Sequence, residues 1–305
     1  MIGVVIPAHN EAAVIGECLD ALLADAGDTP IEVVVVCNAC TDDTAQRAVE
    51  AGSRHGTDIR VIETETPGKV NALNLGDAAC GAFPRCYLDA DVRVGPGSVR
   101  AVAEALGEPD CHAAAPRMVV DAAEAPWTVR RFFDAWVRTG YHRQGMIGSG
   151  FFAMSEAGRS RFEAFPDIIA DDAFARCQFR QDERRVLDGS TFTVRAPRTF
   201  WSLVKIKTRS HLGNLELAAK YPDIWAVAAG GPTGLPRREF LLPHRWPSTL
   251  VYAAVKLISR FRSHRQFRKR EFDRWERDET TRGGQTGPPR AADRPGGVVT
   301  PIRPT

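Results

Sequence analysis

Gly3-Val4-Val5-Ile6-Pro7-Ala8-His9-Asn10-Glu11 is a β-branched run that ends in a proline and a group of polar side chains. Residues 3–7 have the composition of a buried strand, and Asn10 is placed to cap a helix behind it. In that helix the apolar residues recur on one face: Val14, Ile15, Cys18, Leu19 and Leu22. Residues 31–36 form a second β-branched run. The resulting strand–helix–strand unit predicts a parallel sheet with crossover helices.

The same alternation continues to about residue 95 and then weakens. After the second strand we expect a helix over residues 41–51 that stops at Gly52, a strand over 60–62, a helix over 69–81 and a strand over 86–88. Farther on we expect helices over 98–106, 127–141 and 170–179, and strands over 113–119 and 148–154. This pattern predicts an α/β fold with a mostly parallel central sheet flanked by helices and a C-terminal helical extension.

Three regions of the chain differ in composition. Residues 1–246 carry the α/β pattern, residues 247–278 are basic and helical, and residues 279–305 are rich in Gly and Pro. The last region has few apolar residues to bury, so we predict that it is disordered. Within the basic region we expect an amphipathic helix over residues 252–272, whose apolar and arginine residues alternate. Such a helix is either a solvated face or a site of peripheral contact with an anionic membrane.

The composition narrows the possible classes of protein. The net charge of +2 hides a local excess, because residues 256–274 hold eight Lys or Arg against two acidic residues. No apolar run is long enough to span a bilayer, and residues 1–7 lack the features of a secretory signal. Seven cysteines without a disulfide framework agree with a reducing compartment. We therefore expect a cytoplasmic protein, which is peripheral at the inner face of the membrane if the basic helix is a lipid contact and not a solvated face.

Two carboxylates follow the predicted strand over residues 86–88. Asp89 and Asp91 are separated by one residue, so both can face the same side of a cleft at the strand end. Such a pair suits Mg²⁺ or Mn²⁺, which takes one or two protein carboxylates and completes its shell with phosphate oxygens and water. A solvated turn is the alternative for an isolated pair of this kind.

Several familiar sites are missing from the sequence. Neither G-x-G-x-x-G nor the phosphate-binding P-loop pattern follows the first strand. Cys37 and Cys40 have no second pair of metal ligands at zinc spacing, so we do not expect a zinc or redox site there. No nucleic-acid-binding fingerprint is present.

The order of the motifs resembles that of the family 2 glycosyltransferases, which have the nucleotide-sugar-binding fold called GT-A. Four segments in the first third carry the resemblance: residues 4–11, Val36-Cys37-Asn38-Ala39-Cys40-Thr41-Asp42-Asp43-Thr44, Gly68-Lys69-Val70-Asn71-Ala72-Leu73-Asn74, and Leu88-Asp89-Ala90-Asp91. A looser match follows at residues 148–153 and at Ile169-Ala170-Asp171-Asp172. The resemblance implies a GT-A domain with a nucleotide-sugar-binding half over residues 1–95 and an acceptor half over 96–246.

The resemblance also assigns residues to the donor. It implies that Pro7, Ala8, His9, Asn10 and Glu11 line the nucleotide pocket. It places Lys69 near the donor, Asp89 on the ribose or the metal, and Asp91 on the metal. Asn38 falls in the pair that usually reads the nucleotide base, and the first member of that pair is Cys37 in this chain.

For catalysis the resemblance implies that Asp172, or else Asp171, is the general base for one in-line, inverting displacement. The Gln-x-x-Arg-Trp signature of processive synthases is absent, so repeated chain extension is not expected. Arg209 and His211 lie in a basic stretch expected before a helix. Arg209 could then neutralise the leaving diphosphate and His211 could complete the metal shell, with a solvated basic turn as the alternative.

We therefore expect a metal-dependent, inverting glycosyltransferase that uses a nucleotide-diphosphate sugar. Its acceptor would be a hydroxyl of a glycan or a lipid-linked molecule in the synthesis of a cell-surface polysaccharide, a glycolipid or another glycoconjugate. Two alternatives remain at this stage. One is a sugar-phosphate nucleotidyltransferase. Such an enzyme is expected to have a Gly-rich, Arg-containing loop after the first strand, and Pro7-Ala8-His9-Asn10 argues against it. The other is a catalytically silent nucleotide-binding scaffold.

Overall fold

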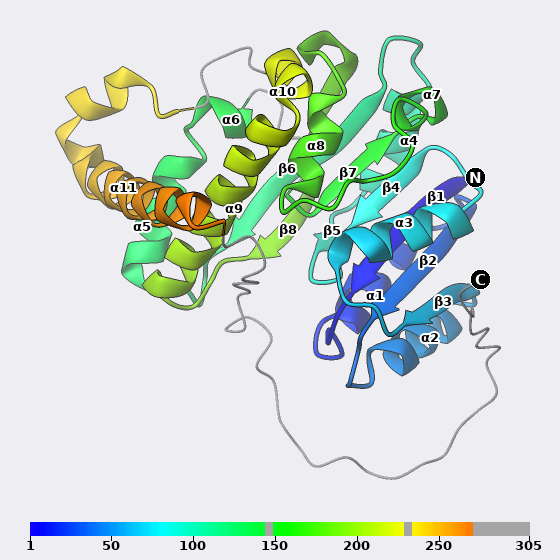
Figure 1. Cartoon of the computed structure of the whole chain (residues 1–305). Helices are drawn as coiled ribbons and strands as arrows, with labels where there is room; N and C mark the ends of the chain where they lie inside the picture. Colours follow the sequence, from blue (N-terminus) through cyan, green and yellow to red (C-terminus); the bar gives the residue numbers. More distant parts are fainter. Residues whose placement is uncertain (144–148, 229–233, 271–305) are drawn as a thin grey trace.

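The structure is a computed structural model that describes residues 1–143, 149–228 and 234–270. Within these residues eight strands form one mixed sheet in the order β3-β2-β1-β4-β7-β6-β8-β5 (Figure 1). The expected strand residue Gly148, the end of the basic helix at Phe272 and the tail over 279–305 lie outside the described residues.

The first half of the sheet is parallel. Its strands are β1 (Ile2–Ala8), β2 (Ile31–Asn38), β3 (Ile59–Thr64) and β4 (Arg85–Leu88). The pairs β1–β2, β2–β3 and β1–β4 all run parallel. Parallel neighbours place their carboxyl ends on the same edge, so the polar groups that follow these strands meet at one edge of the sheet.

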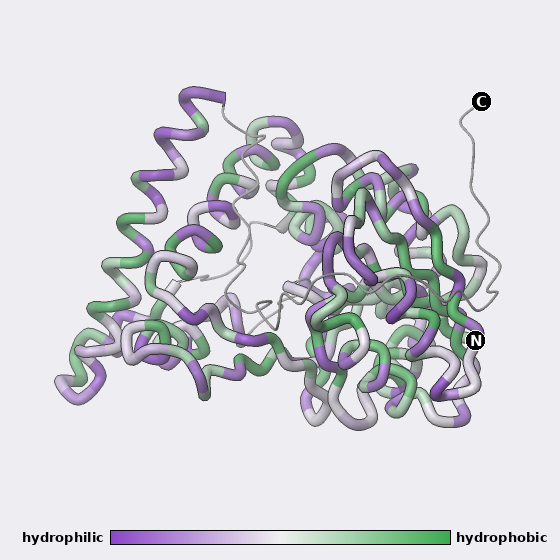
Figure 2. Tube along the Cα trace, turned by 90° about the horizontal axis from the view of Figure 1, so that it is seen from below, coloured by the Kyte–Doolittle hydropathy of each residue, from purple (hydrophilic) through white to green (hydrophobic). Residues whose placement is uncertain are grey.

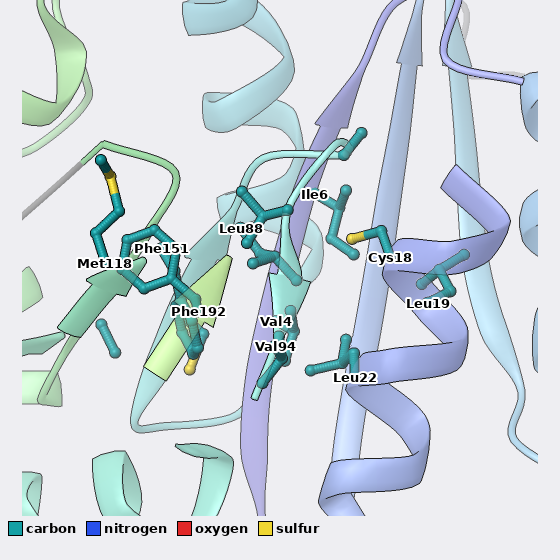
Figure 3. Close-up of a cluster of buried hydrophobic side chains, with 14 of the residues drawn as sticks. Val4, Ile6, Cys18, Leu19, Leu22, Leu88, Val94, Met118, Phe151 and Phe192 are labelled. Atoms are coloured by element: carbon teal, nitrogen blue, oxygen red, sulfur yellow. The ribbon is translucent and has the colours of Figure 1, made fainter. Parts of the chain in front are cut away.

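Helices cover both faces of this half. They are α1 (Ile15–Ala26), α2 (Thr44–Arg54) and α3 (Lys69–Ala79). The helix α4 (Ser98–Leu106) contacts α1 and lies against strands of the second half. Alternation along β1 explains the layers, since Val4 and Ile6 pack in a cluster with α1 while Val5 packs in a separate cluster with α3. Figure 3 shows the first of these clusters, in which Cys18, Leu19 and Leu22 of α1 approach the strand residues.

The second half of the sheet has mixed strand directions. Its strands are β7 (Phe151–Met154), β6 (Ala113–Asp121), β8 (Arg184–Arg195) and β5 (Arg93–Val94). The strand β7 pairs antiparallel with both β4 and β6, whereas β6 and β8 are parallel. The sequence analysis did not find β8. Asp188 and Gly189, which has φ 95°, give its middle the appearance of a turn, and the register shifts opposite it at Pro116/Arg117.

The remaining helices lie beside this second half. The long ones are α5 (Trp127–Trp136), α9 (Phe200–Lys220) and α11 (Trp246–Arg268), and they pack together on the side of the molecule away from β3 and α2 (Figure 1). The shorter ones are α6 (Gly140–Arg143), α7 (Glu156–Arg159), α8 (Asp171–Cys177) and α10 (Pro222–Ala228). Three 3-10 turns lie at η1 (Gln181–Glu183), η2 (Arg237–Leu241) and η3 (Pro243–Arg245). Among the described residues no helix is long and apolar enough to cross a bilayer.

Several expected boundaries differ from the structure. The helix α2 passes through Gly52 instead of stopping there, because this glycine allows close approach: a Cβ would lie 2.6 Å from the backbone oxygen of Thr57. Asn10 does not cap α1, because it has φ 52° and its side chain bonds to Thr41. The basic stretch that was expected before a helix lies inside α9, and α11 begins at Trp246 instead of residue 252.

Candidate active site

A pocket lies at the carboxyl edge of the parallel strands, where β4 meets β7 and α8. It is lined by Pro7, Lys69, Leu73, Tyr87, Leu88, Asp89, Gly150, Phe152, Asp171 and Asp172. These residues come from both halves of the sheet. Five of them were expected as site residues from the sequence: Pro7, Lys69, Asp89, Asp171 and Asp172.

The loops after β1 and β2 are tied to each other beside this pocket. The backbone N–H of Glu11 donates to Thr44 Oγ1 at 2.8 Å, and the N–H of Ala12 donates to Asp42 Oδ2 at 3.1 Å. Asn10 Oδ1 accepts from the N–H of Thr41 at 2.8 Å. The polar residues of both motifs thus fix the loop geometry.

Asn38 and His9 connect these loops to the sheet. Asn38 is 4% exposed, its Nδ2 donates to the carbonyl of Ala8 at 2.7 Å, and its Oδ1 accepts from the N–H of Gly68 at 3.1 Å. The side chain therefore braces the ends of β1 and β2 and the start of α3, and a role in reading the nucleotide base stays a prediction. His9 Nδ1 donates to the carbonyl of Asn38 at 2.6 Å, which fixes the orientation of its ring.

Lys69, the first residue of α3, joins the two halves of the site. Its Nζ lies 2.9 Å from Asp89 Oδ1 and 3.1 Å from Asp171 Oδ2. Burial opposes the positive charge, but the carboxylates of Asp171 and Asp89 outweigh it, so the pKa of Lys69 is raised. The ammonium is therefore charged and holds the end of β4 against the start of α8.

The two adjacent aspartates of α8 have different surroundings. Asp171 is buried, and burial raises its pKa although Lys69 opposes the shift. Asp172 is half-buried, its Oδ2 accepts from the N–H of Ser149 at 3.1 Å, and its Oδ1 accepts from the N–H of Ala173 at 2.7 Å. These bonds hold Asp172 at the pocket wall, where both oxygens keep lone pairs for a further proton.

Asp89 and Asp91 gather around Cys18 of α1. Burial raises the pKa of the Cys18 thiol, and the negative charges of Asp91, Asp89 and Glu11 raise it further. The carboxylates of two separate motifs thus lie near one thiol. No group of three donors that could hold a metal is assembled among the described side chains. Two carboxylates nevertheless suit a hard cation that shares its other positions with phosphate.

Aromatic residues form the floor of the pocket, and the sequence analysis did not single them out. The rings of Tyr87 and Phe152 stack with centroids 5.0 Å apart. The hydroxyl of Tyr87 donates to Asp77 Oδ1 at 2.7 Å, and Arg85 and Arg159 pair with the same carboxylate. Apolar residues in strands are ordinary core residues, so only the position of Tyr87 directly before Leu88 and Asp89 could have indicated this role.

Arg209 and His211 are not among the residues that line the pocket. Both lie within α9, and His211 Nδ1 is 2.9 Å from Ser263 Oγ of α11. The ring of His211 also contacts the ring of His264. The structure therefore places His211 in the contact between two helices, and it does not bring this side chain together with Asp89 and Asp91.

Solved structures with the same fold support the architecture. The chain superposes on a mannosyltransferase from Pyrobaculum calidifontis in complex with GDP-Man and Mn²⁺, with a TM-score of 0.58 and 20% identity over 88% of this chain and 75% of that one. It also superposes on residues 1–349 of S. aureus TarS in complex with UDP, with a TM-score of 0.52 and 17% identity over 90% and 93% of the chains.

A third similar structure is glucosyl-3-phosphoglycerate synthase from Mycobacterium tuberculosis in complex with Mn²⁺, UDP and glucosyl-3-phosphoglycerate. Its TM-score is 0.52, with 20% identity over 72% of this chain and 79% of that one. Among curated protein sequences none matches the chain. The sequence profile described as Glycosyl transferase family 2 matches residues 3–168, which is more than half of the chain and includes the loops, Lys69 and the carboxylates of β4. The chain therefore belongs to glycosyl transferase family 2 and has the GT-A fold.

Proposed function

We propose that this protein transfers a sugar from a nucleoside-diphosphate sugar to an acceptor hydroxyl in one inverting step. The observation that carries the proposal is the pocket in which Lys69 links Asp89, on the donor side, to Asp171, beside Asp172. The donor's diphosphate would lie against Asp89 and Asp91, and the acceptor would enter beside Asp172. Family membership supports the class of donor.

Asp172 is the general base of this proposal. It lies in the wall of the pocket and carries oxygens that are held in place by the N–H groups of Ser149 and Ala173. Such a carboxylate can remove the proton of an acceptor hydroxyl as its oxygen attacks the anomeric carbon. Asp171 is paired with Lys69 and buried, so its role is to fix the position of Lys69.

A divalent cation, Mn²⁺ or Mg²⁺, fits the oxygen donors of Asp89 and Asp91 if the donor's phosphates complete its shell. When bound, it would neutralise the charge that grows on the leaving diphosphate. The similar mannosyltransferase and the similar synthase each contain Mn²⁺, which agrees with this choice. Lys69 supplies a further positive charge beside Asp89.

The test is a panel of UDP-, GDP- and dTDP-sugars incubated with the protein, with and without Mn²⁺, while release of the nucleoside diphosphate is measured. We expect metal-dependent release with at least one donor, faster when a suitable acceptor is present. The α or β configuration of the product, read by NMR, tests inversion. Pyrophosphate release from a nucleoside triphosphate and a sugar phosphate would instead identify a nucleotidyltransferase, and binding without turnover would identify a silent scaffold.

The acceptor is a glycan or a lipid-linked molecule in this proposal, and the pathway is the assembly of a cell-surface polysaccharide, a glycolipid or another glycoconjugate. The support for this part of the proposal is membership of glycosyl transferase family 2. Acceptors of both kinds belong in the same assay, with lipid-linked acceptors presented in vesicles.

A further inference from the structure

The helix α11 buries small polar residues and leaves several large apolar residues exposed. Its buried residues are mainly small and polar: Ser248, Thr249, Val255, Ser259 and Ser263. Two of them bond to α9, since Ser259 Oγ donates to the carbonyl of Val204 at 3.4 Å and Ser263 Oγ lies 2.9 Å from His211 Nδ1. The helix is held against α9 by these small side chains and hydrogen bonds, and Val251, Tyr252 and Ile258 also pack against the core. Its other large apolar residues take no part in this packing.

Those large apolar residues face solvent. Trp246 is 52% exposed, Leu250 is 66%, Leu257 is 72% and Phe261 is 71%. Their spacing of four, seven and four residues places them on one face of the helix. We call these four residues the apolar stripe. In the part of the chain that the structure describes, no side chain buries this stripe, and exposed patches of this kind mark sites of interaction.

The stripe continues beyond the start of α11. The indole N–H of Trp246 donates to the carbonyl of Phe240 at 3.0 Å, so the 3-10 turn η2 is fixed beside the helix. In this turn Phe240 is 52% exposed and Leu241 is 79% exposed. The apolar surface therefore extends from residue 240 to residue 261 along one border of the molecule. Figure 2 shows α11 along the left border, with hydrophobic and hydrophilic segments alternating along the tube.

The same helix is strongly basic. Between residues 246 and 270 there is no Asp or Glu, whereas Lys or Arg occupies positions 256, 260, 262, 265, 268, 269 and 270. Arg260, Arg265 and Arg268 are exposed and lie beside the apolar stripe. Positive charge next to exposed apolar residues matches the border of an anionic bilayer, where headgroups attract the cations and acyl chains accept the apolar side chains.

The positive charge of α11 favours an anionic lipid surface over a second copy of the chain as the partner of the apolar stripe. A second copy of the chain would bring two helices of the same positive charge together, and no acidic residue of α11 could offset them. An anionic lipid surface offers acyl chains to the apolar stripe and negative headgroups to the arginines at the same time. We propose that α11 docks this protein onto an anionic membrane surface, with the apolar stripe in the acyl border and Arg260, Arg265 and Arg268 among the headgroups.

The experiment is flotation of the full chain with vesicles of phosphatidylcholine alone or with 30% phosphatidylglycerol. We expect binding to the anionic vesicles only. Replacing Arg260 and Arg268 by Gln should weaken the partition by roughly twentyfold, since each basic residue near the surface contributes about fivefold. Replacing Leu257 and Phe261 by Ser should weaken it by about tenfold or more, because less apolar area is buried. High salt should weaken the wild-type binding.

Two variants on α2 are matched controls: Val49→Ser removes an exposed apolar residue and Arg47→Gln removes an exposed charge, both away from α11. They should float like the wild type. Because all of the exchanged side chains are exposed, thermal unfolding should be unchanged in every variant. Equal flotation of the wild type and the α11 variants would overturn the proposal. A dimer that Leu257→Ser disperses, without any flotation of the wild type, would overturn it in favour of a second copy.

Discussion

Lys69 is the residue on which the geometry of the pocket depends most. It belongs to α3 in the first half of the chain, and of its two partners Asp89 follows β4 and Asp171 begins α8. Asp171 is 4% exposed, so its charge is stable in that position only while Lys69 compensates it. The ion pair therefore holds the segment after β4 and the start of α8 together.

Lys69→Met is expected to lower the free energy of unfolding by roughly 1–3 kcal/mol, because it leaves a buried carboxylate without its cation. The double variant Lys69→Met with Asp171→Asn should recover much of this loss, since the buried charge is then gone as well. Urea unfolding measures the free energy of unfolding of the single and of the double variant. Lys205→Met on the exposed part of α9 is the control and should change stability by less than about 0.5 kcal/mol. Additive losses in the double variant would contradict the coupling.

At this scale the sequence could indicate residues that end strands or begin helices with a polar group. Asp89 was singled out in this way, whereas Pro7, Lys69 and both aspartates of α8 were assigned through the family resemblance, and the structure brings all five into one pocket. Tyr87 and Phe152 could not be found, because an aromatic residue in a buried strand has the same pattern whether it fills the core or the floor of a pocket. His211 was placed wrongly relative to its helix, because the start of α9 was not recognised.

Among the secondary-structure elements, α9 packs against the segment that precedes Asp171. Glu216 is buried and its Oε2 accepts from the N–H of Ile169 at 2.9 Å. Gly213, one turn earlier, allows Ala170 to approach: a Cβ on this glycine would lie 2.9 Å from Ala170 Cβ. The residue that precedes Asp171 is therefore positioned by one face of α9.

Gly213→Ala should destabilise the protein by about 1–2 kcal/mol and lower turnover, because overpacking against Ala170 outweighs the gain in helix propensity. Gly16→Ala in α1 is the matched control, since the nearest atom to its Cβ would be a flexible arginine nitrogen at 3.8 Å. That exchange should stabilise the protein by about 0.5–1 kcal/mol. Denaturant midpoints measure the stability of both variants, and steady-state rates measure their turnover. If both exchanges stabilise the protein, the close contact of α9 with Ala170 is not a constraint.

The contact between α9 and α11 should weaken in acid. Burial lowers the pKa of His211 to about 4, and the positive charges of Lys256, Arg260 and His264 on α11 add to the shift. A depressed pKa in the folded state means that stability is complete above about pH 6.5 and is lost as the pH falls from there toward 4.

Between pH 7 and pH 5 the wild type should therefore lose about 1 kcal/mol more than His211→Gln, after allowance for solvent screening of a half-buried ring. Thermal unfolding of both proteins at the two pH values measures this difference. The glutamine keeps a hydrogen bond to Ser263 and does not titrate, so parallel losses in the two proteins would show that His211 is not the group responsible.

At the scale of elements, prediction from sequence succeeded where periodicity was regular. The expected helix over residues 98–106 coincides with α4, and the strands of the parallel half were found within a few residues. The one long strand that was missed lies in the second half. There β8 is interrupted by Gly189 and paired through an irregular register, so no local pattern predicts it.

In the whole molecule, the residues of the pocket come from the parallel half and from the mixed half of the fold. The parallel half holds the loops, Lys69 and the carboxylates expected to bind the donor, and the mixed half supplies α8 with the proposed base. Asn74 connects the halves a second time, because its side chain bonds to both the N–H and the carbonyl of Phe165 at 2.9 Å. Donor binding and catalysis should therefore be separable by substitution.

The most direct test of this account is a comparison of Asp172→Asn with Asp91→Asn, in which the affinity for the nucleoside diphosphate with Mn²⁺ and the rate of sugar transfer are both measured. Asp172→Asn should keep the affinity within about threefold and lower the rate by about 10²- to 10⁴-fold, because a general base is removed. Asp91→Asn should lose affinity and rate together. A near-normal rate for Asp172→Asn with collapse for Asp171→Asn would assign the base to Asp171, and near-normal rates for both would contradict the mechanism.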